Sequence, residues 1–176
     1  MIIPGFIITW LTFPGVIVHE LAHKLFCHWT GTKVVEVCYF RFGNPAGYVV
    51  HEIPTNIWKH ILIGVGPLFV NTILGFLIGL LLLPLQHLAY GDMSSFLKFA
   101  IGWLAVSVAM HSFPSTGDAK GIWAAIWDKG APVSAKLVGT PLVGLIFLGA
   151  IGSVVWLDLI YGLGVVVGLP KLLHLG

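Results

Sequence analysis

The sequence predicts an all-α membrane protein with about four transmembrane helices and a small β-hairpin between the first helix and the second. Three observations lead to this fold class. The 176 residues are 57% hydrophobic and only 9% charged, whereas about a quarter of the residues in soluble domains are charged. Several uncharged blocks reach the length of about 20 apolar residues that crosses a bilayer as a helix. One short segment between two such blocks has the β-branched and aromatic composition of strands.

Four apolar blocks are the predicted spans of a single membrane-embedded domain, which covers residues 1–176. Their approximate limits are residues 2–29, 57–85, 96–113 and 137–157. The fourth block continues toward the C-terminus, and at a rise of about 1.5 Å per residue it becomes longer than a hydrocarbon core of about 30 Å. It must therefore tilt, extend beyond the membrane or break, and residues 162–164 are the most favourable place for a break. Residues 159–170 could be interfacial, re-entrant or an extension of the helix.

A segment of different composition, residues 34–53, separates the first two spans. Residues 34–42 are β-branched and aromatic, residues 43–47 contain Gly, Asn and Pro, and residues 48–53 again have strand composition. Two such runs around a turn predict a β-hairpin. It could bind an extended peptide by strand addition, or it could be purely structural.

Lys and Arg side chains favour one side of the predicted bundle. Seven of the nine lie in or beside the hairpin and the loop after the third span, namely Lys24, Lys33, Arg41, Lys59, Lys120, Lys129 and Lys136. Because positively charged loops tend to stay in the cytoplasm, we expect a multi-pass protein with the hairpin on that side. The net charge of +2 and the lack of a basic run argue against a nucleic-acid partner.

The pattern His19-Glu20-Leu21-Ala22-His23 lies at the end of the first predicted span. On a helix, residues four apart stand on the same face, so the two histidines can bind one metal ion. Glu20 then lies beside the ion, where it can take a proton from water. This is the arrangement of helix-borne zinc metalloprotease sites. Solvation at a helix end is the competing explanation, and it does not account for the register of three polar side chains.

Two histidines leave a catalytic zinc one protein ligand short, and Asp118 is the best candidate for the third. The predicted topology delivers Asp118 to the same side of the membrane as His19 and His23. Pro114 and Gly117 favour an unwound backbone just before it, which is tolerated at membrane depth where it lines a cavity. Asp118 could also cap a short helix over residues 119–127, and the two roles are compatible.

His111 is the second candidate catalytic residue, after Glu20. It could stabilise the transition state, orient a ligand or serve as an alternative third ligand, and an ordinary hydrogen bond between helices explains it equally well. Asn71, well inside the second span, is expected to hold helices together, as polar side chains in lipid often do. Cys27 and Cys38 form no CxxC pair and are expected to be small core residues.

Taken in order, these motifs resemble the site-2 protease family. The resemblance covers residues 14–118: the HExxH helix, a strand-rich loop, Gly66-Pro67 followed by Asn71, and an Asp after a Pro-containing segment. The spacings differ slightly from the family pattern, which suggests a divergent, minimal member. The resemblance implies zinc ligands His19, His23 and Asp118 and a general base Glu20. Family members cleave segments of membrane proteins in or near the bilayer.

The expectation is therefore an intramembrane zinc metalloprotease with one Zn²⁺ per chain and its active site near the cytoplasmic face. Its partners would be the lipid bilayer and a membrane protein or peptide as substrate. Two other functions use the same residues. A metal-ion transporter or sensor would need more carboxylates along a path, and an inactive scaffold would have little need of Glu20.

Overall fold

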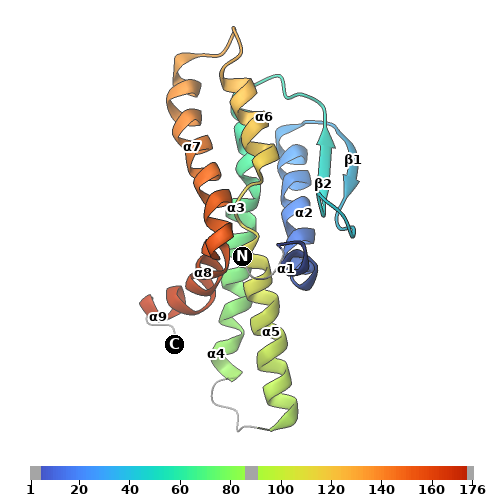
Figure 1. Ribbon diagram of the computed structural model, residues 1–176, viewed down its shortest axis with the longest axis vertical. Coiled ribbons are helices and arrows are strands. Elements are labelled where there is room, and N and C mark those ends of the chain that lie inside the picture. Colours follow the sequence, from blue (N-terminus) through green and yellow to red (C-terminus); the bar gives the residue numbers. More distant parts are fainter. Residues whose placement is uncertain (1–4, 86–90, 174–176) are drawn as a thin grey trace.

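Helices form most of the chain, and one two-stranded sheet lies on the flank of the bundle (Figure 1). The computed structural model describes residues 5–85 and 91–173. The main helices are α1 (Gly5–Leu11), α2 (Phe13–Thr30), α3 (Ile57–Leu80), α4 (Leu82–Leu85), α5 (Asp92–Met110), α6 (Thr116–Ile126), α7 (Val133–Gly152), α8 (Leu157–Leu163) and α9 (Leu169–Leu172). The mostly helical fold with one small sheet confirms that part of the predicted fold class.

Three helical stretches in the described part of the chain are long and apolar enough to cross a membrane. They are Ile57–Leu85, Met93–Met110 and Val133–Val155. The predicted second, third and fourth blocks therefore correspond to long apolar helices, with limits shifted by a few residues. Their outer faces expose large apolar side chains such as Phe69, Phe99 and Leu145, and water-soluble monomers rarely expose apolar surface on this scale.

The first predicted block, residues 2–29, is not one continuous helix. Residues 2–4 lie outside the described part, and α1 meets α2 at an angle of 83°. The break falls at Thr12, and Pro14 sits in the first turn of α2. Proline has no N–H and its ring clashes with the carbonyl four residues earlier, so it starts helices and interrupts them. If the bent pair counts as one span, the number of candidate spans rises to four.

The C-terminal block breaks earlier than its glycines suggested. After α7, a short 3₁₀ turn η1 (Ser153–Val155) leads to Trp156, whose φ of 66° is left-handed. The chain then turns into α8 and continues through a π-helical stretch, η2 (Gly164–Gly168), into α9. This turn lies beside the predicted end of the fourth span at residue 157. At residues 162–164, where a break was considered, the helix continues. Residues 159–170 extend it and pack against α3 and α5.

The predicted hairpin is present as two antiparallel strands, β1 (Val34–Cys38) and β2 (Tyr48–His51). Val37 pairs with Val49, and an irregularity between Val34 and Glu36 accommodates an extra residue in β1. Both strands contact α2. The sheet therefore lies directly beside the helix that carries the HExxH pattern.

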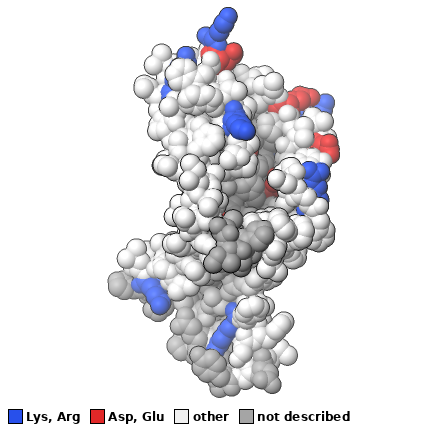
Figure 2. All heavy atoms as spheres, viewed as in Figure 1, with Lys and Arg blue, Asp and Glu red and all other residues white. Residues whose placement is uncertain are grey.

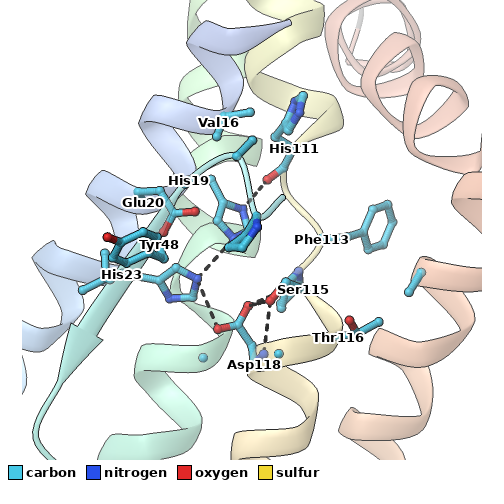
Figure 3. A pocket seen from close by; sticks show the side chains of 18 of the residues that line it. Val16, His19, Glu20, His23, Tyr48, His111, Phe113, Ser115, Thr116 and Asp118 are labelled. Atoms are coloured by element: carbon cyan, nitrogen blue, oxygen red, sulfur yellow. Dashed lines mark hydrogen bonds and ion pairs between the residues drawn. The ribbon is translucent and has the colours of Figure 1, made fainter. Parts of the chain in front are cut away.

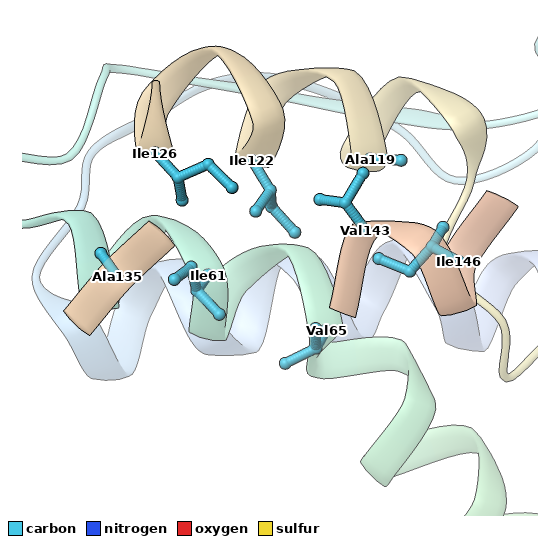
Figure 4. Packing of buried hydrophobic residues seen from close by; sticks show 8 residues of the cluster. All are labelled: Ile61, Val65, Ala119, Ile122, Ile126, Ala135, Val143 and Ile146. Atoms are coloured by element: carbon cyan, nitrogen blue, oxygen red, sulfur yellow. The ribbon is translucent and has the colours of Figure 1, made fainter. Parts of the chain in front are cut away.

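A buried apolar cluster fixes α6 against α3 and α7 (Figure 4). Its members are Ile61, Val65, Ala119, Ile122, Ile126, Ala135, Val143 and Ile146. Ile122 and Ile126 are completely buried, and burying a side chain of this size contributes about 1.5–3 kcal/mol. Because Ala119 belongs to the cluster, this packing also sets the position of Asp118, the residue before it.

Helices α2, α3 and α5 approach one another closely around Gly15. A Cβ atom there would collide with the Ser107 carbonyl oxygen and lie 2.6 Å from His111 Nδ1, so no larger residue fits. The Gly15 N–H donates to Ser107 Oγ at 3.0 Å. Asn71 Nδ2 donates to the carbonyls of Gly15, at 3.2 Å, and Val108, at 3.1 Å. Asn71 thus has the helix-linking role that the sequence predicts.

Charged side chains gather at the end of the molecule that holds the hairpin and the α6–α7 connection (Figure 2). The flanks between this end and the opposite one are mostly uncharged in that view. The hairpin and the start of α6 lie on the same side of the bundle centre in Figure 1. The charge-based prediction that Asp118 would lie at the same end as the hairpin is therefore consistent with the fold.

Candidate metal centre

Helix α2 places His19 and His23 one turn apart on its buried face. Their Nε2 atoms are 3.1 Å apart, and their rings meet edge to face with centroids 4.8 Å apart. Both side chains are more than nine-tenths buried. The two imidazoles thus point at one small volume (Figure 3).

Backbone carbonyls hold the other nitrogen of each ring. His19 Nδ1 lies 2.8 Å from the His111 carbonyl oxygen, and His23 Nδ1 lies 2.9 Å from the Ile63 carbonyl oxygen. A carbonyl only accepts, so each Nδ1 carries the proton and each Nε2 keeps its lone pair. Fixing the tautomer in this way is how metal-binding histidines are usually oriented.

Asp118 faces the two imidazoles from the first turn of α6. Its Oδ1 is 3.4 Å from His23 Nε2. Its Oδ2 accepts hydrogen bonds from Ser115 N, at 2.7 Å, and Ser115 Oγ, at 2.6 Å. Ser115 Oγ in turn accepts from Asp118 N, at 3.2 Å, which completes a capping box. Ser115 is therefore the N-cap of α6, and Asp118, predicted to be the N-cap, is the third residue of the helix, which begins three residues earlier than expected. One Asp118 oxygen completes the capping box, and the other faces the histidines.

Electrostatics keep this carboxylate ionised. Burial alone would raise the pKa of Asp118, but the adjacent His23 and His19 and the hydrogen bond from Ser115 outweigh burial and hold that pKa below its usual value. Metal ligands must be deprotonated carboxylates and neutral imidazoles. Asp118 meets the first requirement, and each imidazole meets the second in the neutral form that carries its proton on Nδ1.

The three ligand atoms fit one metal ion. All lie within 4.8 Å of one another. A tetrahedral zinc with bonds of about 2.0–2.1 Å separates its ligand atoms by about 3.3 Å, close to the 3.1 Å and 3.4 Å seen here. Two nitrogens and a carboxylate oxygen suit zinc, although other divalent metals accept the same ligands. His19, His23 and Asp118 form the one such group among the described residues.

Glu20 is buried beside this group and lines the same cavity. Among the described residues its carboxylate accepts no hydrogen bond, so it is available to water or a substrate. The turn before β2 covers it closely: a Cβ atom at Gly47 would lie 2.6 Å from Glu20 Cγ and 3.0 Å from Glu20 Oε1. Figure 3 shows Glu20 next to Tyr48 of β2 and between the levels of the two histidines.

His111 contributes to the site through its backbone. Its carbonyl orients His19, whereas its imidazole Nδ1 donates to the Ser107 carbonyl at 2.9 Å. The imidazole is not part of the three-residue metal group. It does line the cavity, and the catalytic role predicted for it stays a prediction.

The main cavity has a volume of about 810 Å³ and extends from the hairpin, past the metal group, to the α7–α8 junction. It is lined on one side by Tyr48 and Val49 of β2 and on the other by Ala150 and Ser153. Its size is in the range of ligand-binding clefts.

Sequence reasoning missed the residues that hold the predicted ligands. Ser115-x-x-Asp118 is a capping-box pattern, so Ser115 could have been found from sequence. The carbonyls of Ile63 and His111 could not, because a backbone group leaves no trace in the residue type. Gly47 and Asp158, which also shape the cavity, carry no motif.

Comparisons of this chain with protein-family models, with curated proteins and with solved structures gave no match. The geometry of the His19, His23 and Asp118 group and its position in the helical bundle therefore carry the functional assignment.

Proposed function

We propose that this chain is an integral membrane zinc metalloprotease of the site-2 protease type, which hydrolyses peptide bonds in or near transmembrane segments. The observation that carries the proposal is the convergence of two imidazole Nε2 atoms and one carboxylate oxygen, with Glu20 on the adjacent helix position. The alternation of ligand, base and ligand on one helix is the arrangement that metal-assisted hydrolysis needs.

Membrane location is the second part of the proposal. The long apolar helices and their exposed apolar flanks support a multi-pass protein. The excess of Lys and Arg at the hairpin end supports a site near the cytoplasmic face. In this arrangement water reaches the cavity from the charged end.

His19, His23 and Asp118 would hold the zinc ion. When bound, zinc supplies a Lewis acid that polarises a carbonyl and lowers the pKa of water toward about 7. Glu20 takes one proton from the attacking water as its oxygen bonds to the scissile carbonyl carbon. When the C–N bond breaks, Glu20 returns the proton to the departing amine. The products are a carboxylic acid and an amine, and Glu20 ends in its starting state.

The hairpin supports a way of presenting the substrate. A helical segment hides its carbonyls in i to i−4 bonds, so a substrate must be extended to be cleaved. Strand β2 pairs with β1 on one side and lines the cavity with Tyr48, Val49 and His51. An extended substrate can add along β2 by main-chain hydrogen bonds, which would place it beside Glu20.

The decisive experiment uses detergent-purified protein and a transmembrane peptide substrate. Wild type is expected to bind one zinc per chain by elemental analysis and to cleave. Glu20→Gln should keep the zinc and lose at least about a hundredfold in rate, since proton transfer typically contributes 10²–10⁴-fold. Asp118→Asn should lose both zinc and activity. Cleavage by Glu20→Gln at the wild-type rate would overturn the proposal, and zinc binding without any cleavage by wild type would favour a transporter or sensor.

A further inference from the structure

A second, smaller cavity of about 140 Å³ adjoins the main one on the far side of His111. It lies between α1, the end of α5 and the α7–α8 junction, and the two cavities share Thr9, Met110, His111, Ser153 and Asp158 as lining residues. Its volume is several times the roughly 10–15 Å³ that a single water requires. The two cavities are therefore neighbours.

Three polar side chains around the small cavity, Thr9, His111 and Ser153, offer acceptors. Thr9 Oγ1 donates to the Gly5 carbonyl at 3.0 Å, and Ser153 Oγ donates to the Ala150 carbonyl at 2.7 Å. With Nδ1 of His111 donating to Ser107, its Nε2 is left with a lone pair. Each hydroxyl and the imidazole therefore present only lone pairs to a ligand.

Asp158 adds a negative charge to this set of acceptors. One of its oxygens accepts a hydrogen bond from Leu159 N at 2.9 Å. That oxygen therefore has a structural role in the first turn of α8. Within the described residues 5–85 and 91–173, no ion pair joins this carboxylate to a Lys or Arg. Its negative charge acts on the imidazole of His111, which lines the same cavity. A half-buried carboxylate in an otherwise apolar helix is costly unless it meets a positive group.

The left-handed Trp156 adds an aromatic side chain to the same lining. Its φ of 66° is an uncommon conformation for a large residue and costs on the order of 1 kcal/mol or more. It allows the chain to turn so that Trp156 and Asp158 both line the cavity. An aromatic face beside a carboxylate is a combination that binds cations well.

We propose that this small cavity is a substrate subsite that binds a basic side chain, the ammonium group of Lys or the guanidinium group of Arg. The inference rests on the proposed proteolytic function and names its substrate class: a membrane segment with a Lys or Arg close to the bond that is cleaved. His111 places the subsite beside the metal group: its carbonyl accepts a hydrogen bond from the metal ligand His19, and its imidazole lines the subsite. Such a cation supplies three to five N–H donors, which the Asp158 carboxylate and the acceptors of Thr9, His111 and Ser153 can receive.

The test is peptide binding to Glu20→Gln protein in a nonionic detergent, which contains no amine that could take the place of the side chain. Two sets of fluorescent transmembrane peptides differ only in carrying Lys or Gln at each position of the central segment. At one position or a few adjacent ones, the Lys peptide should bind about tenfold more tightly by anisotropy. Equal affinity of the Lys and Gln peptides at every position would overturn the subsite.

Asp158→Asn is the critical variant, because Asn keeps the oxygen that accepts from Leu159 N and removes the charge. In the Glu20→Gln background it should abolish the preference for Lys, and Asp158→Glu should restore part of it. Asp158→Ser, also neutral and able to start a helix, is the second variant if the first does not fold. Asp128→Asn, an exposed position outside both cavities, is the matched control and should keep the preference. Persistence of the preference in both neutral variants would refute the role of Asp158.

Cleavage by the Glu20-containing protein separates this inference from the proposed function. If wild type cleaves the Lys and Gln peptides equally and Glu20→Gln cleaves neither, the protease proposal stands and the subsite is wrong. If wild type cleaves no peptide but Glu20→Gln still prefers Lys peptides through Asp158, the cationic site stands and the protease proposal is wrong.

Discussion

Ser115 is the residue on which the orientation of Asp118 depends. Through its N–H and its hydroxyl it binds the Asp118 oxygen that faces away from the histidines. The other oxygen is therefore aimed at His23. Hydrogen bonds that orient a metal ligand in this way usually contribute a factor of about 10–100 to metal affinity.

We predict that Ser115→Ala weakens zinc binding by about 10–100-fold. It should also lower the free energy of unfolding by about 1 kcal/mol through loss of the helix cap. Chelator competition measures the first effect and thermal unfolding the second. Ser134→Ala, at an exposed position, is the control, and an unchanged zinc affinity in Ser115→Ala would show that Asp118 does not need this support.

Gly47 lets the backbone of the hairpin approach Glu20. We predict that Gly47→Ala lowers the cleavage rate by about tenfold to a hundredfold, since displacement of a catalytic group by about 1 Å can cost that much. Zinc content should stay the same, because the new Cβ meets Glu20 and the Tyr39 carbonyl and none of the three ligands. Gly43→Ala is the matched control, as its Cβ would make only ordinary contacts with Arg41. Equal rates for the two variants would contradict the prediction.

Among the contacts between helices, the contact of α2 with α5 at Gly15 leaves no space for a side chain. Gly15 on α2 lies against the Ser107 carbonyl of α5, one turn before His19, and against the imidazole of His111. A side chain there must push the two helices apart. That movement would also break the bond between His19 and the His111 carbonyl.

We predict that Gly15→Ala lowers the free energy of unfolding by about 1–3 kcal/mol, the usual cost of overpacking, and reduces zinc affinity. Gly144→Ala in α7 is the matched control, because nothing lies within 4 Å of its Cβ. There the lower flexibility of Ala should leave stability equal or higher by up to about 1 kcal/mol. Unfolding followed by circular dichroism in detergent distinguishes the two, and equal stability of both variants would refute the tight contact.

Sequence reasoning predicted these elements unevenly, for physical reasons. The second to fourth apolar blocks are long and charge-free, and nothing in them competes with a helix. Hydropathy is continuous across the bend at Thr12, so only Pro14-Gly15 indicated that the first helix could kink, and the bend falls two residues before Pro14. The predicted end of the fourth span, at residue 157, lies beside the turn at Trp156, because Asp158 interrupts the apolar run there. The glycines at 162 and 164 suggested a further break, but the helix continues through them. For the site, the spacing of His19 and His23 and the charge bias predicted the residues, whereas the carbonyls that orient them depend on tertiary packing.

At the scale of the whole molecule, the metal group joins α2 to α6, two helices whose contact with each other is otherwise indirect. The main partner of α6 is the apolar cluster with α3 and α7. A bound ion would therefore link α2 directly to α6. Ligands that bind only the folded state stabilise it by an amount that grows with their concentration.

We predict that zinc raises the free energy of unfolding by about 2.7 kcal/mol at a free concentration of 100 times its Kd, and that a chelator removes this increase. Asp118→Asn and His23→Ala should show little or no zinc-dependent change. The measurement is thermal unfolding with and without zinc or chelator. A zinc-dependent shift that persists in both variants would place the metal elsewhere in the protein.

The position of the ligands on two separate helices has a consequence for biosynthesis. His19 and His23 leave the ribosome early, and Asp118 follows about 5–20 s later at ordinary elongation rates of about 5–20 residues per second. Until α6 has been made and has packed on α3, the nascent chain exposes two histidines and no third ligand. We therefore expect zinc capture to be a late event that follows assembly of the bundle, so that newly made chains stay proteolytically silent while they are being inserted.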